Sequence, residues 1–278
     1  MLDITSIFEH SFMIRALIGG ILISICAALL GVSLVLKKYS MIGDGLSHVG
    51  FGALAIGSAA SFPPLEFSIP IVIVSAFFLL RISENSKIKG DAAIALISTG
   101  ALAIGITAAS LSGVNTDIEN YLFGSILSLS NGDIVLCWTV FAVVMILYIL
   151  FYNKIFAVTF DESFAKATGT KVGLYNMLIA LLTALTVVIG MKLMGTLLIS
   201  SLIIFPAIIS MRICKCFKMV TITSAIVSIT SFFIGLVVSY YLATPTGASI
   251  VLVNLCVLII FSIVGSIKDK ISAKNYIK

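Results

Sequence analysis

Charged residues are scarce in this chain, and their scarcity excludes an ordinary soluble domain. Asp, Glu, Lys and Arg make up only 10% of the 278 residues, whereas soluble domains carry about 25%. Hydrophobic residues make up 60%, and the mean hydropathy is +1.22. This composition predicts an all-α, polytopic helical membrane protein, because helices satisfy their own backbone hydrogen bonds in lipid. We expect residues 1–278 to form one integral-membrane domain within the lipid bilayer.

Several signatures of enzymes and nucleic-acid binders are missing as well. The sequence has no Gly-x4-Gly-Lys-Ser/Thr loop, so it does not hydrolyse ATP by that route, and it has no His-Glu-x-x-His motif. Its net charge of +5 is divided among short loops, which does not indicate a nucleic-acid partner. The five cysteines are too scattered for a disulfide framework. Cys214 and Cys216 could contact a soft metal, although free thiols at a helix end are the simpler interpretation.

The hydrophobic segments predict about nine transmembrane helices. Eight is the lower count, because some segments lie near the limit of about 17 residues for crossing. A short interfacial or re-entrant helix is expected at residues 118–129, where apolar side chains recur at helical spacing. The expected spans are residues 14–36, 41–60, 67–80, 91–111, 134–152, 173–190, 193–211, 220–241 and 248–267.

The distribution of basic residues predicts the orientation of the chain. Lys and Arg follow the odd-numbered spans almost throughout, and only Arg15 and Lys192 fall on the other side. Cytoplasmic loops of membrane proteins carry an excess of Lys and Arg. We therefore expect the N-terminus outside and the C-terminus in the cytoplasm.

One polar pair lies inside the second hydrophobic segment. Asp44 and His48 are four residues apart, a spacing that places two helical side chains on one face, roughly 6 Å apart. Ionisable groups at membrane depth usually face a cavity or a transport path. A carboxylate and a neutral imidazole also suit a divalent first-row metal ion. We interpret the pair as part of a metal pathway; the alternative is a structural hydrogen-bonded pair inside the bundle.

Glycines surround this polar pair. Gly43, Gly45 and Gly50 lie within a few residues of it, and further glycines follow along the same segment. Small residues let helix backbones approach closely. We also expect them to leave space for a cavity.

The longest polar connection, residues 153–172, predicts a short cytoplasmic helix. Asp161 and Glu162 suit the start of a helix and Gly169 suits its end. Phe164 and Ala165 are expected on one face of this helix. In a transporter such a helix suits the docking of an energising subunit, and the alternative is a helix that lies on the bilayer surface.

Three stretches, taken in order, resemble the ABC-type zinc/manganese/iron permease family. Residues 38–48 carry an Asp and a His separated by three residues in a glycine-rich helix. Residues 121–130 read Tyr-Leu-Phe-Gly-Ser-Ile-Leu-Ser-Leu-Ser, similar to the Tyr-Leu-Phe-Gly-x-Ile-Leu segment of the family. Residues 195–207 run from Gly-Thr-Leu-Leu through small and apolar residues to Phe-Pro-Ala. The resemblance spans nearly the whole chain.

The resemblance implies a homodimeric permease of the bacterial cell membrane that is not itself an enzyme. It implies two partners, a cytoplasmic ATPase subunit and an extracellular metal-binding protein that delivers the ion. The zinc, manganese or iron ion is then transported cargo, and no permanent cofactor is expected. The resemblance assigns Asp44 and His48 to the transmembrane metal pair. It assigns the residues from Asp161 to Gly169 to the coupling helix that meets the ATPase.

Two other functions remain as alternatives. In a stand-alone, proton-coupled secondary transporter, Asp44 and His48 would relay protons, and the purified chain would take up metal under a proton gradient alone. An intramembrane hydrolase would need a Ser/His pair across two helices. Residues 45–48 read Gly-Leu-Ser-His, so His48 replaces the final Gly of the Gly-x-Ser-Gly motif of intramembrane serine proteases. The second histidine, His10, lies outside the spans.

Overall fold

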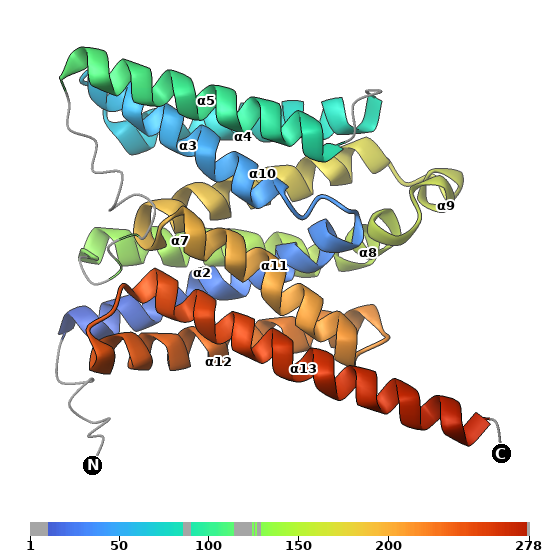
Figure 1. Cartoon of the computed structure of the whole chain (residues 1–278). Helices are drawn as coiled ribbons and strands as arrows, with labels where there is room; N and C mark the ends of the chain where they lie inside the picture. Colours follow the sequence, from blue (N-terminus) through green and yellow to red (C-terminus); the bar gives the residue numbers. More distant parts are fainter. Residues whose placement is uncertain (1–10, 86–89, 114–123, 125, 127–128, 277–278) are drawn as a thin grey trace.

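The computed structural model describes residues 11–85, 90–113, 124, 126 and 129–276, and all of its regular structure within those residues is helical (Figure 1). The expected helix at residues 118–129 falls mostly outside the described residues, as does His10. Two short helices, α8 (Tyr152–Phe160) and α9 (Glu162–Ala167), separate α7 from α10. The described residues also form nine long helices: α2 (Ser11–Leu36), α3 (Ile42–Ala59), α4 (Pro64–Asn85), α5 (Gly90–Ser112), α7 (Asn131–Leu150), α10 (Val172–Met194), α11 (Thr196–Ile213), α12 (Phe217–Leu242) and α13 (Thr246–Tyr276).

The length and the apolar character of the long helices are those of a polytopic membrane protein. Within the described residues, seven of them are long and apolar enough to cross a membrane, namely α2, α5, α7, α10, α11, α12 and α13. In α4 the apolar stretch is shorter, Pro64–Leu79. The helix α3 contains Asp44 and His48, which lower its apolar character. Each expected span overlaps one of the nine long helices.

The boundary between α10 and α11 differs from the expected one. The expected spans leave the break between residues 190 and 193, next to Gly190, but the helix continues to Met194 and breaks at Gly195. Gly195 has φ +84°, a left-handed conformation that glycine adopts without strain. Gly190 instead packs inside the helix, where an added Cβ would lie 2.5 Å from Ile199 Cδ1.

The helices form three groups that lie side by side (Figure 1). The helices α3, α4 and α5 lie together on one side, and α12 and α13 lie on the other. Between these groups run α2, α7, α10 and α11. The helix α2 is the most buried of the candidate spans, and it packs against α7, α10, α11 and α12. Its burial explains why its sequence is apolar all round.

The backbones of α3 and α5 approach each other at two glycines. A Cβ added to Gly52 would lie 2.4 Å from the carbonyl oxygen of Ala101, and one added to Gly105 would lie 2.4 Å from Gly52 Cα. Such contacts are too short for any real side chain, so both positions require glycine. This packing holds α3, the helix of the polar pair, against its neighbour.

We expect Gly52→Ala to lower the free energy of unfolding by about 1–3 kcal/mol, because the new methyl group forces the two backbones apart. Gly100→Ala is the matched control, since no atom lies within 4 Å of an added Cβ there. That variant should be neutral or stabilised by up to about 1 kcal/mol. Thermal unfolding of both variants in detergent micelles measures the difference. Equal unfolding temperatures of the two variants would show that α3 and α5 can separate enough for the methyl group without a loss of stability.

Candidate functional site

Asp44 and His48 lie in the first half of α3 and face the same space. The Asp44 Oδ2 and His48 Nε2 atoms are 3.6 Å apart. This distance is longer than a hydrogen bond, so the two groups are close without being locked together. The side chain of Asp44 is 40% exposed and that of His48 is 25% exposed. The predicted placement of both side chains on one helix face is confirmed.

Two serines complete the surroundings of Asp44. Ser200 on α11 lies 3.3 Å from Asp44 Oδ1 and donates a hydrogen bond to it. Ser47 Oγ donates to the backbone carbonyl of Asp44 at 2.7 Å. Sequence reasoning did not single out Ser200, although it lies in the stretch of residues 195–207. No local pattern could have paired it with Asp44, because 156 residues separate them.

Side chains of neighbouring helices occupy the space beside the glycines near the pair. A Cβ on Gly43 would lie 2.6 Å from Ile203 Cδ1, and one on Gly45 would lie 2.4 Å from Ile94 Cγ2. At Gly50 the corresponding atom is Met191 Cε, also at 2.6 Å. The expectation that these glycines leave space for a cavity is therefore wrong. Their role is to let side chains of α5, α10 and α11 pack directly on the backbone of α3.

The donor set at the pair is small. Within the described part of the chain, no group of three or more His, Cys, Asp or Glu residues could hold a metal ion. Protein sites that retain zinc use three or four protein ligands. His48 Nδ1 is buried and has no hydrogen-bond partner, whereas a histidine in a permanent metal site donates this second nitrogen to an oxygen. One carboxylate and one imidazole suit the passage of an ion rather than its retention.

The predicted start and end of the short helix in residues 153–172 are confirmed by α9. The Asp161 side chain caps its first turn, with Oδ1 accepting from the backbone N–H groups of Ser163 at 2.9 Å and Phe164 at 3.0 Å. Such N-caps stabilise helices because they pair otherwise unsatisfied donors. The helix ends at Ala167, and Gly169 follows with φ +77°.

The placement of Phe164 and Ala165 on one face is wrong. Ala165 is fully buried against Val158 and Val172, whereas Phe164 is 61% exposed. Consecutive helical residues point in different directions, so one of them anchors α9 and its neighbour projects outward. The ring of Phe164 is the largest apolar side chain that α9 exposes.

A model of the ABC 3 transport family matches residues 9–265 of the chain. The chain belongs to the ABC 3 transport family.

Relatives and a solved structure extend this match over most of each chain. The permease is 32% identical to a probable metal transport system membrane protein of Thermotoga maritima, over 88% of this chain and 87% of that protein. It is 28% identical to the manganese import system permease protein ScaB of Streptococcus gordonii, over 92% of each. The structure of PsaBC from Streptococcus pneumoniae in complex with Fab is similar with a TM-score of 0.83 and 29% identity, over 93% of each chain.

The family membership confirms the resemblance drawn from the sequence. The chain is a multi-pass cell-membrane protein and the permease subunit of a metal-ion ABC transporter. In such transporters ATP hydrolysis belongs to a separate subunit, in keeping with the missing phosphate-binding loop.

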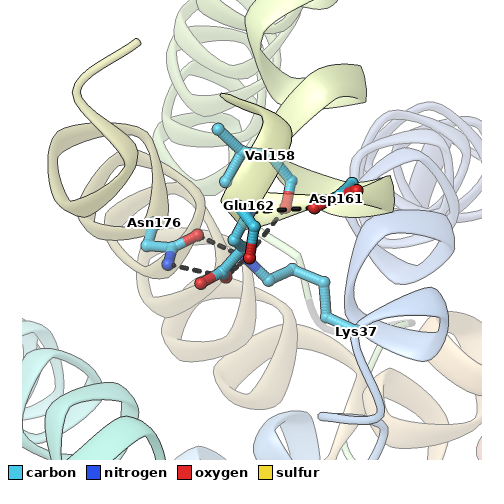
Figure 2. Close-up of polar contacts among 6 residues, drawn as sticks. Lys37, Val158, Asp161, Glu162 and Asn176 are labelled. Atoms are coloured by element: carbon cyan, nitrogen blue, oxygen red, sulfur yellow. Dashed lines mark hydrogen bonds and ion pairs between the residues drawn. The ribbon is translucent and has the colours of Figure 1, made fainter. Parts of the chain in front are cut away.

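The ABC 3 permease contains a second polar cluster, at the inner face of α9 (Figure 2). The side chain of Lys37, directly after α2, is only 6% exposed, and its Nζ atom lies 2.6 Å from Glu162 Oε1. Lys37 also donates to Asn176 Oδ1 and, at 3.4 Å, to the carbonyl of Val158. Asn176 Nδ2 donates to Glu162 Oε1 at 3.1 Å. The sequence uses Lys37 only as one of the basic residues that predict the orientation of the chain. No local pattern pairs it with Glu162, because 125 residues separate the two.

The cluster lowers the pKa of Glu162. Partial burial by itself raises this pKa, but the hydrogen bonds from Lys37 and Asn176 and the positive charge of Lys37 outweigh burial and hold it below its ordinary value. A lowered folded-state pKa means that the ionised form stabilises the folded state. This contribution is complete above the ordinary pKa of about 4.3 and is lost as the pH falls through the lowered value.

We expect the pH dependence of unfolding to show this contribution. Wild-type permease should unfold at a higher temperature than Glu162→Gln at pH 7, because the amide forms a weaker bond with Lys37. The difference should begin to shrink as the pH falls below about 4.3, where the carboxylate of the unfolded chain becomes protonated, and should be smallest below the lowered pKa of the folded chain. Thermal unfolding in detergent between pH 7 and the acid limit of the protein measures it. A difference that stays constant over this range would contradict the assignment.

Proposed function

We propose that this permease conducts a divalent first-row metal ion, such as zinc, manganese or iron, past Asp44 and His48, driven by a separate ATPase subunit. The observation that carries the proposal is the half-exposed Asp44 carboxylate beside the His48 imidazole in a helix of a metal-transporter permease. The carboxylate attracts the cation and the imidazole nitrogen ligates it. Two protein ligands leave the other coordination positions of the ion free, so its release stays fast.

The proposed topology has nine spans in one integral-membrane domain, with α3 and α4 crossing together with the seven apolar helices. Lys37 contacts α9, and the chain then alternates direction from helix to helix, so α9 and the end of α13 lie on the same side (Figure 1). That side would be the cytoplasm, since it also carries most of the loop lysines and arginines. The opposite side carries the ion pair between Asp133 and Lys192, at 2.9 Å.

We propose that the transporting unit contains two copies of the permease. A second copy would add a second Asp44 and His48, which raises the number of protein ligands along the path from two to four. The exposure of the Asp44 side chain supports this arrangement, because a carboxylate at membrane depth requires a polar cavity or a partner beside it. An extracellular metal-binding protein would deliver the ion to the outer mouth.

We expect Asp44→Asn and His48→Ala each to abolish metal uptake in cells while the permease still folds. The first variant removes the negative charge and the second removes the nitrogen donor. The matched control is Glu66→Gln, the same loss of a carboxylate charge at an exposed residue in the first turn of α4. The measurements are uptake of Zn²⁺, Mn²⁺ and Fe²⁺, together with thermal stability.

The alternatives predict other outcomes for the same variants. If the pair is only structural, stability falls by roughly 0.6–2 kcal/mol per lost hydrogen bond and uptake falls only in proportion to the folded fraction. In a stand-alone secondary transporter, the purified wild-type chain takes up metal under a proton gradient without any ATPase. Normal uptake by a stably folded Asp44→Asn, His48→Ala double variant would refute the metal pathway.

We propose that the ATPase subunit docks on α9 through the exposed ring of Phe164. Phe164→Asp should put a charge into an apolar contact and sharply reduce co-purification of the ATPase, while membrane insertion is unchanged. Phe62→Asp is the matched control, because Phe62 is similarly exposed at 57% but lies at the far end of α3. Equal recovery of the ATPase with both variants would rule out docking on α9.

A further inference from the structure

Lys37 joins three parts of the chain that are distant in sequence. It follows the last residue of α2, pairs with Glu162 in the first turn of α9, and bonds Asn176 in the second turn of α10 (Figure 2). A lysine whose side chain is 6% exposed needs such partners, because an unpaired buried charge is strongly unfavourable. The cluster therefore fixes the position of α9 relative to the end of α2.

The segment after Lys37 leads directly to the metal pair. Only residues 37–41 separate α2 from α3, and Asp44 lies seven residues after Lys37. This corner is held by backbone hydrogen bonds from Tyr39 N to Leu34 O, at 2.8 Å, and from Ile42 N to Tyr39 O, at 3.0 Å. No long loop therefore lies between Lys37 and the start of α3.

The conformation of Lys38 shows how tightly the corner is built. Lys38 has φ +62°, in the left-handed region that non-glycine residues seldom adopt. Its N–H donates to Val35 O at 3.1 Å, and with the bond from Tyr39 to Leu34 this completes a Schellman cap of α2. The cap keeps the chain reversal immediately beyond the Lys37 side chain.

We propose that Lys37 is a positioning residue that transmits movement of the docking helix α9 to Asp44 and His48. This inference rests on the proposed docking of the ATPase on α9 and the proposed metal path. When the ATPase moves α9, Glu162 moves with it. Separating Glu162 from Lys37 would leave a buried charge unpaired, so the α2–α3 corner follows α9 rather than parting from it. Asn176 keeps the carboxylate aimed at Lys37 and links the same movement to α10.

The transmitted movement would act on the metal pair from one side. The helix α3 begins at Ile42, and its first turns carry Asp44 and His48. Ser200, which bonds Asp44, belongs to α11. A shift of α3 relative to α11 therefore changes the distance between Asp44 and Ser200 and the access to the carboxylate. This is a direct mechanical route from ATP hydrolysis to the release of the ion.

The test compares transport with hydrolysis in the reconstituted complex of permease, ATPase subunit and metal-binding protein. The variants are Lys37→Met, Lys37→Arg and the double variant Lys37→Met/Glu162→Met, in which no charge remains unpaired and folding is preserved. Lys38→Met is the matched control, the same substitution at the exposed neighbouring lysine. The measured quantities are co-purification of the ATPase, its rate of hydrolysis, and Mn²⁺ or Zn²⁺ transported per ATP hydrolysed.

We expect Lys37→Met and the double variant to keep the ATPase bound and active while metal transported per ATP falls about tenfold. Lys37→Arg should retain most of the ratio, because the guanidinium still pairs with Glu162, and Lys38→Met should equal wild type. A wild-type ratio in the double variant would overturn the inference. Loss of ATPase binding in Lys37→Met and in the double variant would also overturn it, because Lys37 would then only hold α9 in place. Failure of the docking proposal is seen separately, as normal ATPase binding by Phe164→Asp.

Discussion

The lack of hydrogen-bonding solvent in the bilayer core is the constraint on which the rest of this structure depends. Backbone groups there must pair within their own helix, and the polar side chains of the spans largely do the same. Thr183 and Thr186 donate to the carbonyls of Ile179 and Leu182 in the preceding turn. Ser224 and Ser228 on α12 instead donate to backbone carbonyls of α2. Against this background of neutral bonds, a charged side chain that reaches from one helix to another stands out.

Asp44 and Lys37 are the two ionic groups that form such contacts near the start of α3. Asp44 faces His48 and accepts from α11, while Lys37 reaches from the end of α2 to α9 and α10. One group is half-exposed and suits a passing cation, and the other is buried and fully partnered. The different exposure fits the roles that we propose for them, since an ion path must remain open and a mechanical link must not come apart.

The packing of α3 explains how a helix with an open polar face is held in place. Glycines on its other faces bring Ile94, Met191 and Ile203 against its backbone, and Gly52 contacts α5 directly. Dispersion contacts of this kind replace the hydrophobic effect as the force between helices in lipid. In the coupling that we propose, this close packing would carry a displacement at the N-terminal corner of α3 to Asp44 and His48.

The sequence by itself determined the all-helical membrane class, the position of each long helix, the Asp44 and His48 face, and the cap of α9 by Asp161. These features arise from hydropathy and from hydrogen bonds or spacings within four residues. Only the tertiary structure decided that Phe164 points away from Ala165, that Ser200 meets Asp44, and that Lys37 pairs with Glu162. Those contacts join residues on different helices, or depend on which side of a helix is covered, and helix packing settles both.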